Sequence, residues 1–350
     1  MSHALVLGAS GISGWALLNQ LTQYPNPTTF SKITGLSNRP LTLEQAQLQA
    51  DPRLSLVNGI DLTKSVSEVA QLLKEKIKDA QSITHVFFTG MIFLRLPLIS
   101  YGLEFPKEVG VHPPLREDMP RIPEPYASKI FYYTQYDLLT QLSKGKSWTF
   151  SEVRPDGIVG FTPTSNAMNM SQGIGLYLSV YREVHGKGAV VPFPGEQHGY
   201  QSTHSDTFQD VLAKMEIHAA THIKECGNGG VFNVADGQTV TWAQVWPKLA
   251  AHFGLKGEGP KPNTVPMEEF VRNNQETWKA LVVKYGLKAR AMDEQNWGHV
   301  HFMLVQFDFD RQYDLSRSRA VGFQEEIDTA EGYFISWERM RSAKILPPLQ

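Results

Sequence analysis

The sequence is poor in cysteine and in long apolar runs. Its single cysteine, Cys226, cannot form an internal disulfide, so a disulfide-stapled small domain is excluded and a reducing compartment is favoured. The longest apolar stretch beyond the N-terminus, residues 91–99, contains an arginine and a proline and falls short of the roughly 20 residues of a membrane span. Residues 1–10 lack the basic start and long apolar core of a signal peptide. We therefore expect a cytoplasmic protein with no membrane segment.

Net charge is also small. The 33 basic and 35 acidic side chains leave a formal charge of −2, which provides no positive field for a polyanion. Nucleic acid and membrane surfaces are therefore not expected as partners. The hydrophobic share of 41% and the charged share of 19% are those of an ordinary globular protein, which excludes a disordered chain. With 350 residues, the chain is long enough for two domains or one enlarged domain.

Apolar runs alternate with helical patterns in the first half of the chain. The runs that predict strands occupy residues 4–7, 32–37, 54–57 and 84–89. Residues 66–77, which lie between the last two runs, carry apolar side chains at helical spacing. This alternation predicts an α/β fold with a Rossmann-like, doubly wound parallel sheet.

The chain is expected to divide into two regions. Residues 1–162 are predicted to form a Rossmann domain that binds a dinucleotide and is shortened between residues 90 and 130. Residues 163–350 are predicted to form a smaller C-terminal substrate-binding region, in which the pattern of strands and helices is less regular. Some of its elements are expected to return to the first domain.

A glycine-rich turn follows the first predicted strand. Gly8, Gly11 and Gly14 are spaced three residues apart, with Ser10 and Ile12 between them, and a helical pattern begins directly afterwards. Glycine is needed where the backbone turns sharply and approaches a pyrophosphate, whose charge then rests on the exposed amides of the helix N-terminus. These five residues are therefore candidate contacts of a dinucleotide cofactor. The alternative is a merely tight turn.

The end of the second predicted strand indicates which cofactor is used. An acidic residue there would accept the ribose hydroxyl of NADH, whereas a basic residue would accommodate the 2′-phosphate of NADPH. The residues are Ser37, Asn38 and Arg39, with no carboxylate among them. Arg39 and Ser37 are suited to charge-assisted bonds with a phosphate, so NADPH is the expected cofactor. The alternative is that Arg39 is only a solvated loop residue.

Two further segments are candidates for the adenine side and the centre of the cofactor site. Asp61 and Leu62 follow the third predicted strand, where folds of this type contact the adenine ring. Asp61 is equally suited to cap a helix, and this alternative stays open. Thr89, at the end of the fourth predicted strand, completes the expected set of cofactor contacts.

A set of short motifs is spread over nearly the whole chain. They are GASGISG (8–14), SNR (37–39), DL (61–62), HVFFT (85–89), REDMPR (116–121), FYYTQYDLL (131–139), EVRPDGIVGFTP (152–163), VFNVADG (231–237), TWAQVWPKLAAHFG (241–254), VGF (321–323) and FISWERMR (334–341). Together they resemble the progesterone 5β-reductase and iridoid synthase-like group of extended short-chain dehydrogenases, in particular its fungal members.

This resemblance implies an activity and a catalytic residue. Enzymes of the group use NADPH to reduce the activated double bond of an enone or enal, and some relatives act on carbonyls. The substrate is then a small hydrophobic metabolite, and the fungal likeness implies secondary metabolism. The family tyrosine falls on Tyr132, whose phenol would donate a hydrogen bond to the oxygen that becomes an enolate. The alternative for Tyr132 is a partly buried aromatic residue with a satisfied hydroxyl. The sequence leaves a homodimer open.

The chain departs from the family pattern at one catalytic position. The family carries a lysine in a TGxKxY segment, where the ammonium group orients the cofactor and lowers the pKa of the tyrosine. Alignment of that segment on Tyr101 places Ile99 at the lysine position. Lys107 and Lys129 are not obvious substitutes. Tyr126 and Lys129 are one residue short of the YxxxK spacing of common short-chain dehydrogenases, which also counts against a nucleotide-sugar epimerase.

The same region is short for its fold. Only residues 90–95 separate the fourth predicted strand from a candidate fifth strand at residues 96–101, whereas a parallel crossover needs about a dozen residues or more. A helix and part of a strand are therefore expected to be missing. The alternative function is a catalytically impaired NADP-binding protein, or a truncated gene product that lacks the active-site lysine.

Histidines and methionines give weaker signals. His198, His204, His299 and His301 have no third ligand at a recognisable spacing, so no metal site is expected. Residues 168–170 (Met-Asn-Met) follow the EVRPDGIVGFTP segment and are expected to line the substrate pocket, although methionine is more often core filler.

Overall fold

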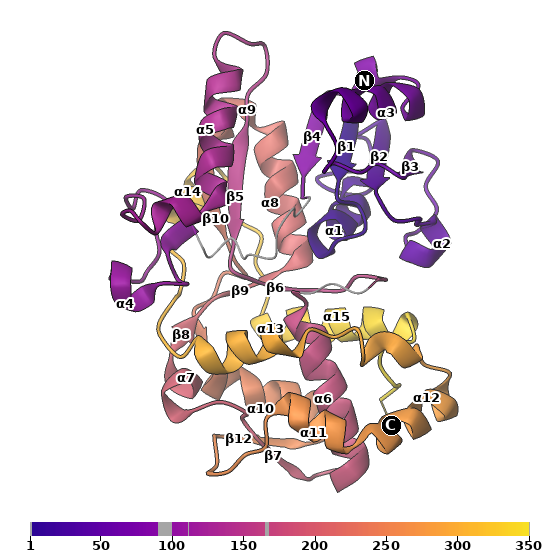
Figure 1. Cartoon of the computed structure of the whole chain (residues 1–350), viewed down its shortest axis with the longest axis vertical. Helices are drawn as coiled ribbons and strands as arrows, with labels where there is room; N and C mark the ends of the chain where they lie inside the picture. Colours follow the sequence, from indigo (N-terminus) through magenta and orange to yellow (C-terminus); the bar gives the residue numbers. More distant parts are fainter. Residues whose placement is uncertain (1, 90–99, 111, 165–167, 350) are drawn as a thin grey trace.

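The structure is a computed structural model that describes residues 2–89, 100–110, 112–164 and 168–349. Its N-terminal part is a four-stranded parallel sheet with the order β3-β2-β1-β4 and helices around it (Figure 1). The elements are β1 (His3–Leu7), α1 (Ile12–Leu21), β2 (Lys32–Ser37), α2 (Leu43–Ala46), β3 (Leu54–Asn58), α3 (Val66–Lys76) and β4 (His85–Phe88). The predicted α/β fold with a parallel sheet is therefore confirmed.

The local sequences of β1, α1 and β2 account for how these elements pack. All five residues of β1 are buried, and the apolar side of α1 packs Leu17 and Leu18 into the core with no exposed surface. The middle of β2 is Gly35, where a Cβ atom would lie 2.9 Å from side-chain atoms of both Leu18 and Leu56. Glycine at this position lets the helix approach the sheet closely.

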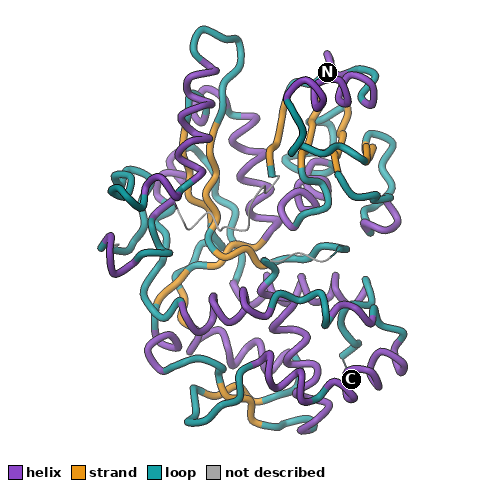
Figure 2. The backbone as a smooth tube through the Cα atoms, viewed as in Figure 1, coloured by secondary structure: helices purple, strands orange, loops and turns teal. Residues whose placement is uncertain are grey.

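The rest of the chain is mostly helical, with short strands in pairs (Figure 2). The pairs are β5 (Ser151–Pro155) with β10 (Gly230–Val234), β6 (Gly157–Val159) with β9 (Asp206–Phe208), β7 (Val190–Pro192) with β12 (Lys256–Glu258), and β8 (Thr203–His204) with β11 (Val240–Thr241). Only the β8–β11 pair is antiparallel. The pairing of β10 with β5 joins residues about 80 positions apart, so part of the late chain lies beside the strand that precedes residue 162.

The helices of this part have the following bounds. They are α4 (Pro106–Val109), α5 (Phe131–Ser143), α6 (Met170–His185), α7 (Gln197–Gln201), α8 (Gln209–Thr221), α9 (Ile223–Cys226), α10 (Trp242–His252), α11 (Met267–Asn273), α12 (Gln275–Tyr285), α13 (Trp297–His301), α14 (Ser316–Ala320) and α15 (Thr329–Ser342). None of the helices in the part of the chain that the structure describes is both long and apolar enough to cross a membrane.

The sheet is interrupted after β4. Among the described residues, β4 pairs only with β1, and β5 pairs only with β10. The candidate strand at residues 96–101 is wrong for the two of its residues that the structure describes, because Ser100 and Tyr101 lie in a 3-10 turn. Its other residues, Ile99 included, lie outside the described part. Val86 and Phe88, which share one face of β4, are 61% and 51% exposed.

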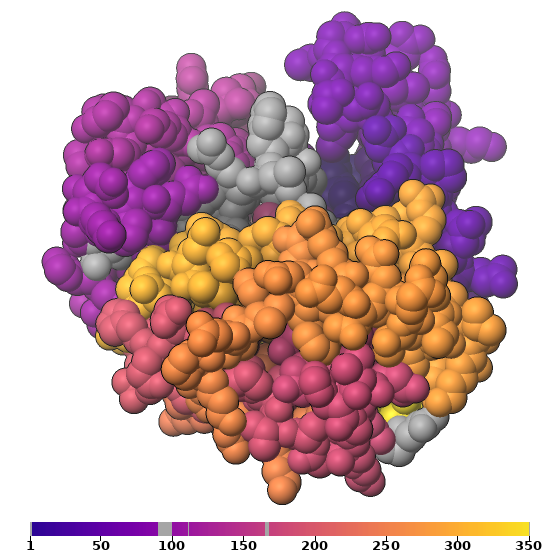
Figure 3. Space-filling view, turned by 60° about the horizontal axis from the view of Figure 1, so that its bottom comes forward, coloured from indigo at the N-terminus to yellow at the C-terminus, as the bar shows by residue number. Residues whose placement is uncertain are grey.

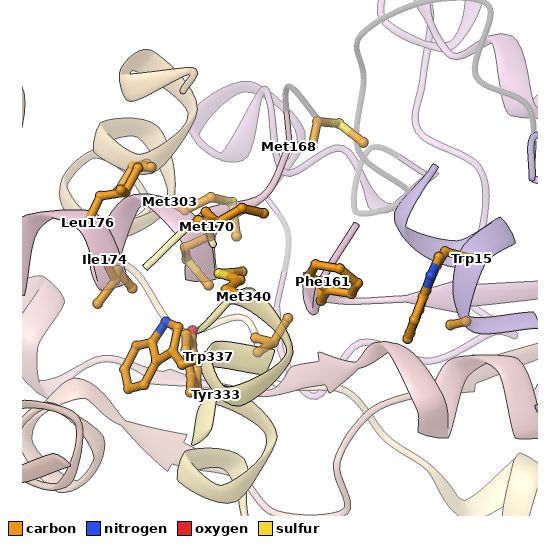
Figure 4. Packing of buried hydrophobic residues seen from close by; sticks show 14 of the residues in the cluster. Trp15, Phe161, Met168, Met170, Ile174, Leu176, Met303, Tyr333, Trp337 and Met340 are labelled. Carbon is orange, nitrogen blue, oxygen red and sulfur yellow. The ribbon is translucent and has the colours of Figure 1, made fainter. Parts of the chain in front are cut away.

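Most of the C-terminal half forms the lower part of the molecule and faces the carboxyl ends of the N-terminal strands, whereas α8, α9 and β10 lie in the upper part beside β5 (Figure 1). Its late elements, orange and yellow in Figure 3, make one continuous face in front of the N-terminal part. Its core centres on Tyr333 and Trp337 of α15, which pack with several methionines (Figure 4). The Trp337 indole donates a hydrogen bond to the carbonyl of Ser171 at 2.8 Å, which fixes α15 against the start of α6.

Candidate active site

The glycine turn lies between β1 and α1, at the carboxyl edge of the sheet. Gly8 has a φ of +95°, a conformation that favours glycine, and the Gly11 amide donates to the Gly8 carbonyl at 2.9 Å. A Cβ atom at position 14 would collide with the Gly8 carbonyl oxygen and lie 3.0 Å from Oγ1 of Thr89. All three glycines and Thr89 are thus brought together. Thr89 also donates its hydroxyl to the Leu7 carbonyl, at 2.9 Å.

No side chain caps the backbone amides in the first turn of α1. Gly11 is the N-cap residue and has no side chain to accept from the following amides, and the turn contains no acidic residue. A helix N-terminus carries unsatisfied N–H groups and a partial positive charge, and phosphate groups bind there readily. Ile12 is buried in the hydrophobic cluster around α8, whereas Ser10 is partly exposed at the turn. The geometry therefore fits the pyrophosphate of a dinucleotide.

The end of β2 exposes a basic side chain. Ser37 is buried, and its hydroxyl donates to the Arg39 carbonyl at 2.8 Å, which stabilises the turn after the strand. Asn38 and Arg39 are exposed. Among the described residues, no carboxylate pairs with the Arg39 guanidinium. A guanidinium that no carboxylate neutralises is suited to a phosphate.

Asp61 and Leu62 follow β3 at the same edge of the sheet. Oδ1 of Asp61 accepts from the Thr63 hydroxyl at 2.7 Å and from the Thr63 amide at 3.0 Å, and these bonds hold the pKa of Asp61 below its usual value. The cap of the next helix is instead Ser65. The helix-cap alternative for Asp61 is therefore wrong, because its carboxylate closes a local turn. Leu62 packs at the margin of a small cluster below the sheet.

The two adjacent tyrosines at the start of α5 have different surroundings. The Tyr133 hydroxyl donates to the Ser100 carbonyl at 2.6 Å and accepts from the Ile122 amide at 3.2 Å, so this residue ties the preceding loops to α5. Tyr132 is partly buried, and the centre of its ring lies 4.0 Å from that of Phe131. Burial and the nearby carboxylate of Glu152 raise the pKa of Tyr132 well above its usual value. Its phenol is therefore neutral and able to donate a proton in a hydrogen bond.

The positions of Lys129 and Lys107 bear on the missing family lysine. The Lys129 ammonium lies 5.1 Å from the ring centre of Phe105 and 5.4 Å from that of Tyr126, in cation–π geometry. Tyr126 and Lys129 thus contact each other. Lys107 is exposed on α4, and Ile99, at the family lysine position, lies outside the described residues.

A buried polar pair beside the tyrosines was not predicted. Arg154 on β5 binds Glu152 through Nε at 2.9 Å, with 13% and 19% of the two side chains exposed. The Arg154 guanidinium also lies over the ring of Tyr101, whose hydroxyl donates to Oδ1 of Asn233 at 2.5 Å. Residues 152 and 154 alternate by two along a strand and so share one face, which is the signal the sequence offered. The partners from positions 101 and 233 come from distant parts of the chain.

The histidines are dispersed. His204 is fully buried, and burial holds its pKa well below the usual value, so its ring is neutral. His198 lies on α7, and His299 and His301 lie on α13. In the described ranges of the chain, no group of three or more histidine, cysteine, aspartate or glutamate side chains is arranged to hold a metal ion.

The expected pocket residues lie at the junction of the two halves. Met168, Asn169 and Met170 are buried, with Asn169 as the N-cap of α6, where its side chain accepts from the Gln172 amide. Met168 and Met170 belong to the core that Figure 4 shows between Phe161 and α15.

Three features of the described residues are typical of a Rossmann-type short-chain dehydrogenase: a parallel sheet with a glycine turn after its first strand, a helix start without a side-chain cap, and a basic residue at the end of the second strand. The profile of the PRISE-like Rossmann-fold domain matches residues 4–95 and 99–347. The chain therefore belongs to this family, which comprises the progesterone 5β-reductase and iridoid synthase-like enzymes, and the resemblance noted from the motifs is confirmed.

Curated relatives support the same assignment. The short chain dehydrogenase sirQ of Leptosphaeria maculans is 34% identical, covering 99% of this chain and 98% of the relative. The short chain dehydrogenase ausT of Aspergillus calidoustus is 32% identical, covering 99% and 94%. The (S)-8-oxocitronellyl enol synthase of Nepeta racemosa is 29% identical, covering 99% and 93%. This chain is accordingly an oxidoreductase of the short-chain dehydrogenase type.

Solved structures agree on the fold. UDP-glucose 4-epimerase from Bifidobacterium longum, solved with NAD⁺ and UDP, is 14% identical with a TM-score of 0.57, covering 97% of this chain and 98% of that one. At this identity the likeness concerns the fold alone.

The comparisons also show a difference in length. The alignment with the Aspergillus relative spans 387 positions, which exceeds the 350 residues of this chain by 37. At least that many aligned positions therefore have no residue here. The family profile is interrupted between residues 95 and 99, in the region that follows β4.

Proposed function

We propose that this protein is an NADPH-dependent reductase of small hydrophobic enones or carbonyl compounds. The observation that carries the proposal is the combination of a glycine-constrained, uncapped start of α1 with an exposed Arg39 at the end of β2. The first feature suits a pyrophosphate, and the second suits a 2′-phosphate. When bound, NADPH supplies the hydride.

The residues of this chain have distinct roles in the proposal. Gly8, Gly11 and Gly14 let the backbone approach the pyrophosphate, and Arg39 pairs with the 2′-phosphate. Asp61, Leu62 and Thr89 lie along the same edge of the sheet. The carboxyl ends of parallel strands are where ligands of such folds bind.

Tyr132 is the proposed catalytic residue. Its phenol is protonated at neutral pH, as that of an ordinary tyrosine is, and can therefore donate to the substrate oxygen as negative charge develops there. Its raised pKa makes it a weaker donor than a tyrosine beside the family lysine. The Tyr132 phenol does not have to lose its proton before it donates this hydrogen bond. The fungal relatives named short chain dehydrogenase support the oxidoreductase class, and our proposal adds a role in secondary metabolism.

The cofactor part is tested by binding. Titration of the full chain with NADPH and NADH, followed by nicotinamide fluorescence, should give tighter binding of NADPH. Arg39→Ala should weaken NADPH binding by about 10- to 100-fold, as expected for the loss of a charge-assisted bond, and should leave NADH unchanged. Arg290→Ala, which removes an exposed arginine of the C-terminal half, serves as the control. Equal binding of both cofactors by the wild type would refute the role of Arg39.

The catalytic part is tested by turnover of a panel of enones and enals. Tyr132→Phe should lower kcat by about 100-fold or more without changing the Kd of NADPH, because it removes only the oxyanion donor. Tyr136→Phe on the same helix removes a hydroxyl that donates to the Gly229 carbonyl and should keep full turnover. Unchanged turnover in Tyr132→Phe would remove this residue from the mechanism.

A second candidate function is an NADP-binding protein without reductase activity. The isoleucine at position 99 and the shortened region after β4 favour it, because no lysine at position 99 lowers the pKa of Tyr132. Tight NADPH binding with no turnover of any compound in the panel supports this function over the first. Turnover that depends on Tyr132 excludes it.

A further inference from the structure

Two threonine hydroxyls contact the backbone of the glycine turn. Oγ1 of Thr162 and Oγ1 of Thr164 each lie 3.2 Å from the carbonyl oxygen of Ser10. The two threonines are also bonded to each other, because Thr162 Oγ1 accepts from the Thr164 amide at 3.2 Å. Thr162 has no exposed surface. We call Thr162 and Thr164 the threonine clasp.

The Ser10 carbonyl has no donor within its own helix. The first bond of α1 runs from the Trp15 amide to the Gly11 carbonyl at 2.9 Å, so the Ser10 carbonyl points away before the helical ladder begins. A carbonyl left unpaired in a buried place destabilises the turn. The Thr164 hydroxyl supplies the missing donor, although it lies about 150 residues along the chain. The Thr162 hydroxyl shares its one proton between the Ser10 carbonyl at 3.2 Å and the Thr164 carbonyl at 2.9 Å, and the second bond holds the two threonines together.

The peptide between Ser10 and Gly11 is thereby held at both ends. Its carbonyl faces the threonine clasp, and its amide donates to the Gly8 carbonyl at 2.9 Å. This peptide directly precedes the first turn of α1. Its orientation therefore sets the direction of the amides that follow, which are those proposed to receive the pyrophosphate.

The segment that carries the clasp is itself anchored to the C-terminal half. The Phe161 amide donates to Oε1 of Gln209 at 2.6 Å, and the Lys288 ammonium donates to the Pro163 carbonyl at 3.2 Å. The Phe161 ring packs edge-on against Trp15 of α1, with ring centres 5.0 Å apart, as Figure 4 shows. Gln209 begins α8, which packs against α1, so the Lys288 bond is the link from the clasp segment to the predicted substrate-binding region.

We propose that Thr162 and Thr164 are positioning residues for the cofactor pyrophosphate, and that they link the glycine turn to the substrate side. The proposal rests on the proposed function, because it assigns the amides of α1 to a pyrophosphate. A turn fixed before binding loses less conformational freedom when the cofactor binds, which raises affinity. The hydroxyls act through the Ser10 peptide and do not touch the cofactor.

The test replaces both hydroxyls by methyl groups of similar size. The double variant Thr162→Val, Thr164→Val should bind NADPH about tenfold more weakly, equivalent to about 1.4 kcal/mol. Adenosine 2′-monophosphate, which has the 2′-phosphate but no pyrophosphate, should bind it within twofold of the wild type. The serine variant, Thr162→Ser with Thr164→Ser, keeps both hydroxyls and should restore NADPH binding. Thr221→Val removes a comparable hydroxyl at the end of α8 and is the matched control.

A second measurement needs no cofactor. Amide hydrogen exchange over residues 10–14 of the free protein should be faster in the double valine variant than in the wild type or the serine variant. Weaker NADPH binding together with faster exchange supports the proposal. Equal NADPH affinity of the valine variant and the wild type overturns it, as does an equal loss of affinity for adenosine 2′-monophosphate.

Failure of the proposed function has a different signature. In that case the wild type itself binds neither NADPH nor adenosine 2′-monophosphate. Hydrogen exchange then tests only whether the clasp orders the glycine turn. Unchanged exchange in the valine variant refutes that role of the clasp.

Discussion

Three buried aspartates predict an unusual dependence of stability on pH. Asp156, Asp206 and Asp236 are buried, and the buried guanidinium of Arg311 acts on Asp156 and Asp206, with its Nε 3.8 Å from Oδ1 of Asp156. Burial, and for Asp156 the neighbouring Asp206, raises the pKa of Asp156 to about 7. Burial likewise raises the pKa of Asp206 to about 6 and that of Asp236 well above its usual value. His204, Tyr313 and Tyr333 complete the titratable groups around them.

These pKa values give the sign and the size of the change in stability with pH. A carboxyl whose pKa is higher in the folded chain stabilises the fold below its unfolded pKa of 3.8, and this contribution is lost as pH rises through the folded pKa. For Asp156 the full loss is on the order of 4 kcal/mol, at 1.36 kcal/mol for each factor of ten between pKa 3.8 and about 7. Roughly 3 kcal/mol of it falls between pH 5 and pH 8.5.

The perturbation is Asp156→Asn, which keeps the shape and the acceptor for the Gly157 amide but cannot ionise. Urea unfolding of wild type and variant at several pH values from 5 to 8.5, at constant ionic strength, gives the free energy of unfolding. The wild type should lose roughly 3 kcal/mol more than the variant over this range. Asp118→Asn, which removes an exposed carboxylate paired with Arg116, should leave the slope unchanged. Parallel pH profiles for wild type and Asp156→Asn would refute the reasoning.

Three other substitutions have clear expected outcomes. Gly14→Ala places a Cβ against the Gly8 carbonyl and should abolish NADPH binding in the fluorescence titration, and normal affinity would contradict the close packing of this turn. Trp337→Ala should lower the free energy of unfolding by about 3 to 5 kcal/mol in urea titrations, against less than about 1 kcal/mol for the 43% exposed Trp148→Ala. Arg154→Met leaves the carboxylate of Glu152 buried without its partner and should cost about 3 kcal/mol by the same assay, and a neutral effect would show that water solvates Glu152.

The sequence predicted the local elements of the first half closely. The apolar run at residues 32–37 coincides with β2, and the helical spacing at residues 66–77 coincides with α3 to within one residue. The turn between β1 and α1 was readable because glycine spacing, strand and helix follow one another directly. Such features depend on neighbours in the chain, so periodicity and turn chemistry reveal them.

Contacts between residues far apart in the chain could not be predicted from the sequence. The expected strand at residues 96–101 was wrong at Ser100 and Tyr101, because an apolar run is equally compatible with a buried turn. The contacts of Thr162 and Thr164 with Ser10 join positions about 150 residues apart. No local pattern specifies such a pairing, since the topology alone brings these residues together.

Among the described residues no strand pairs with the outer edge of β4, and this has a consequence for the behaviour of the protein in concentrated solution. A strand with unpaired backbone groups and outward apolar side chains is a template for a strand of another molecule, and Val86 and Phe88 supply such side chains. Their neighbours His85 and Thr84 carry no fixed charge that would repel an incoming strand. Colloidal stability should therefore improve when Phe88 is replaced by lysine, a residue that natural sheets use at their edges to keep molecules apart.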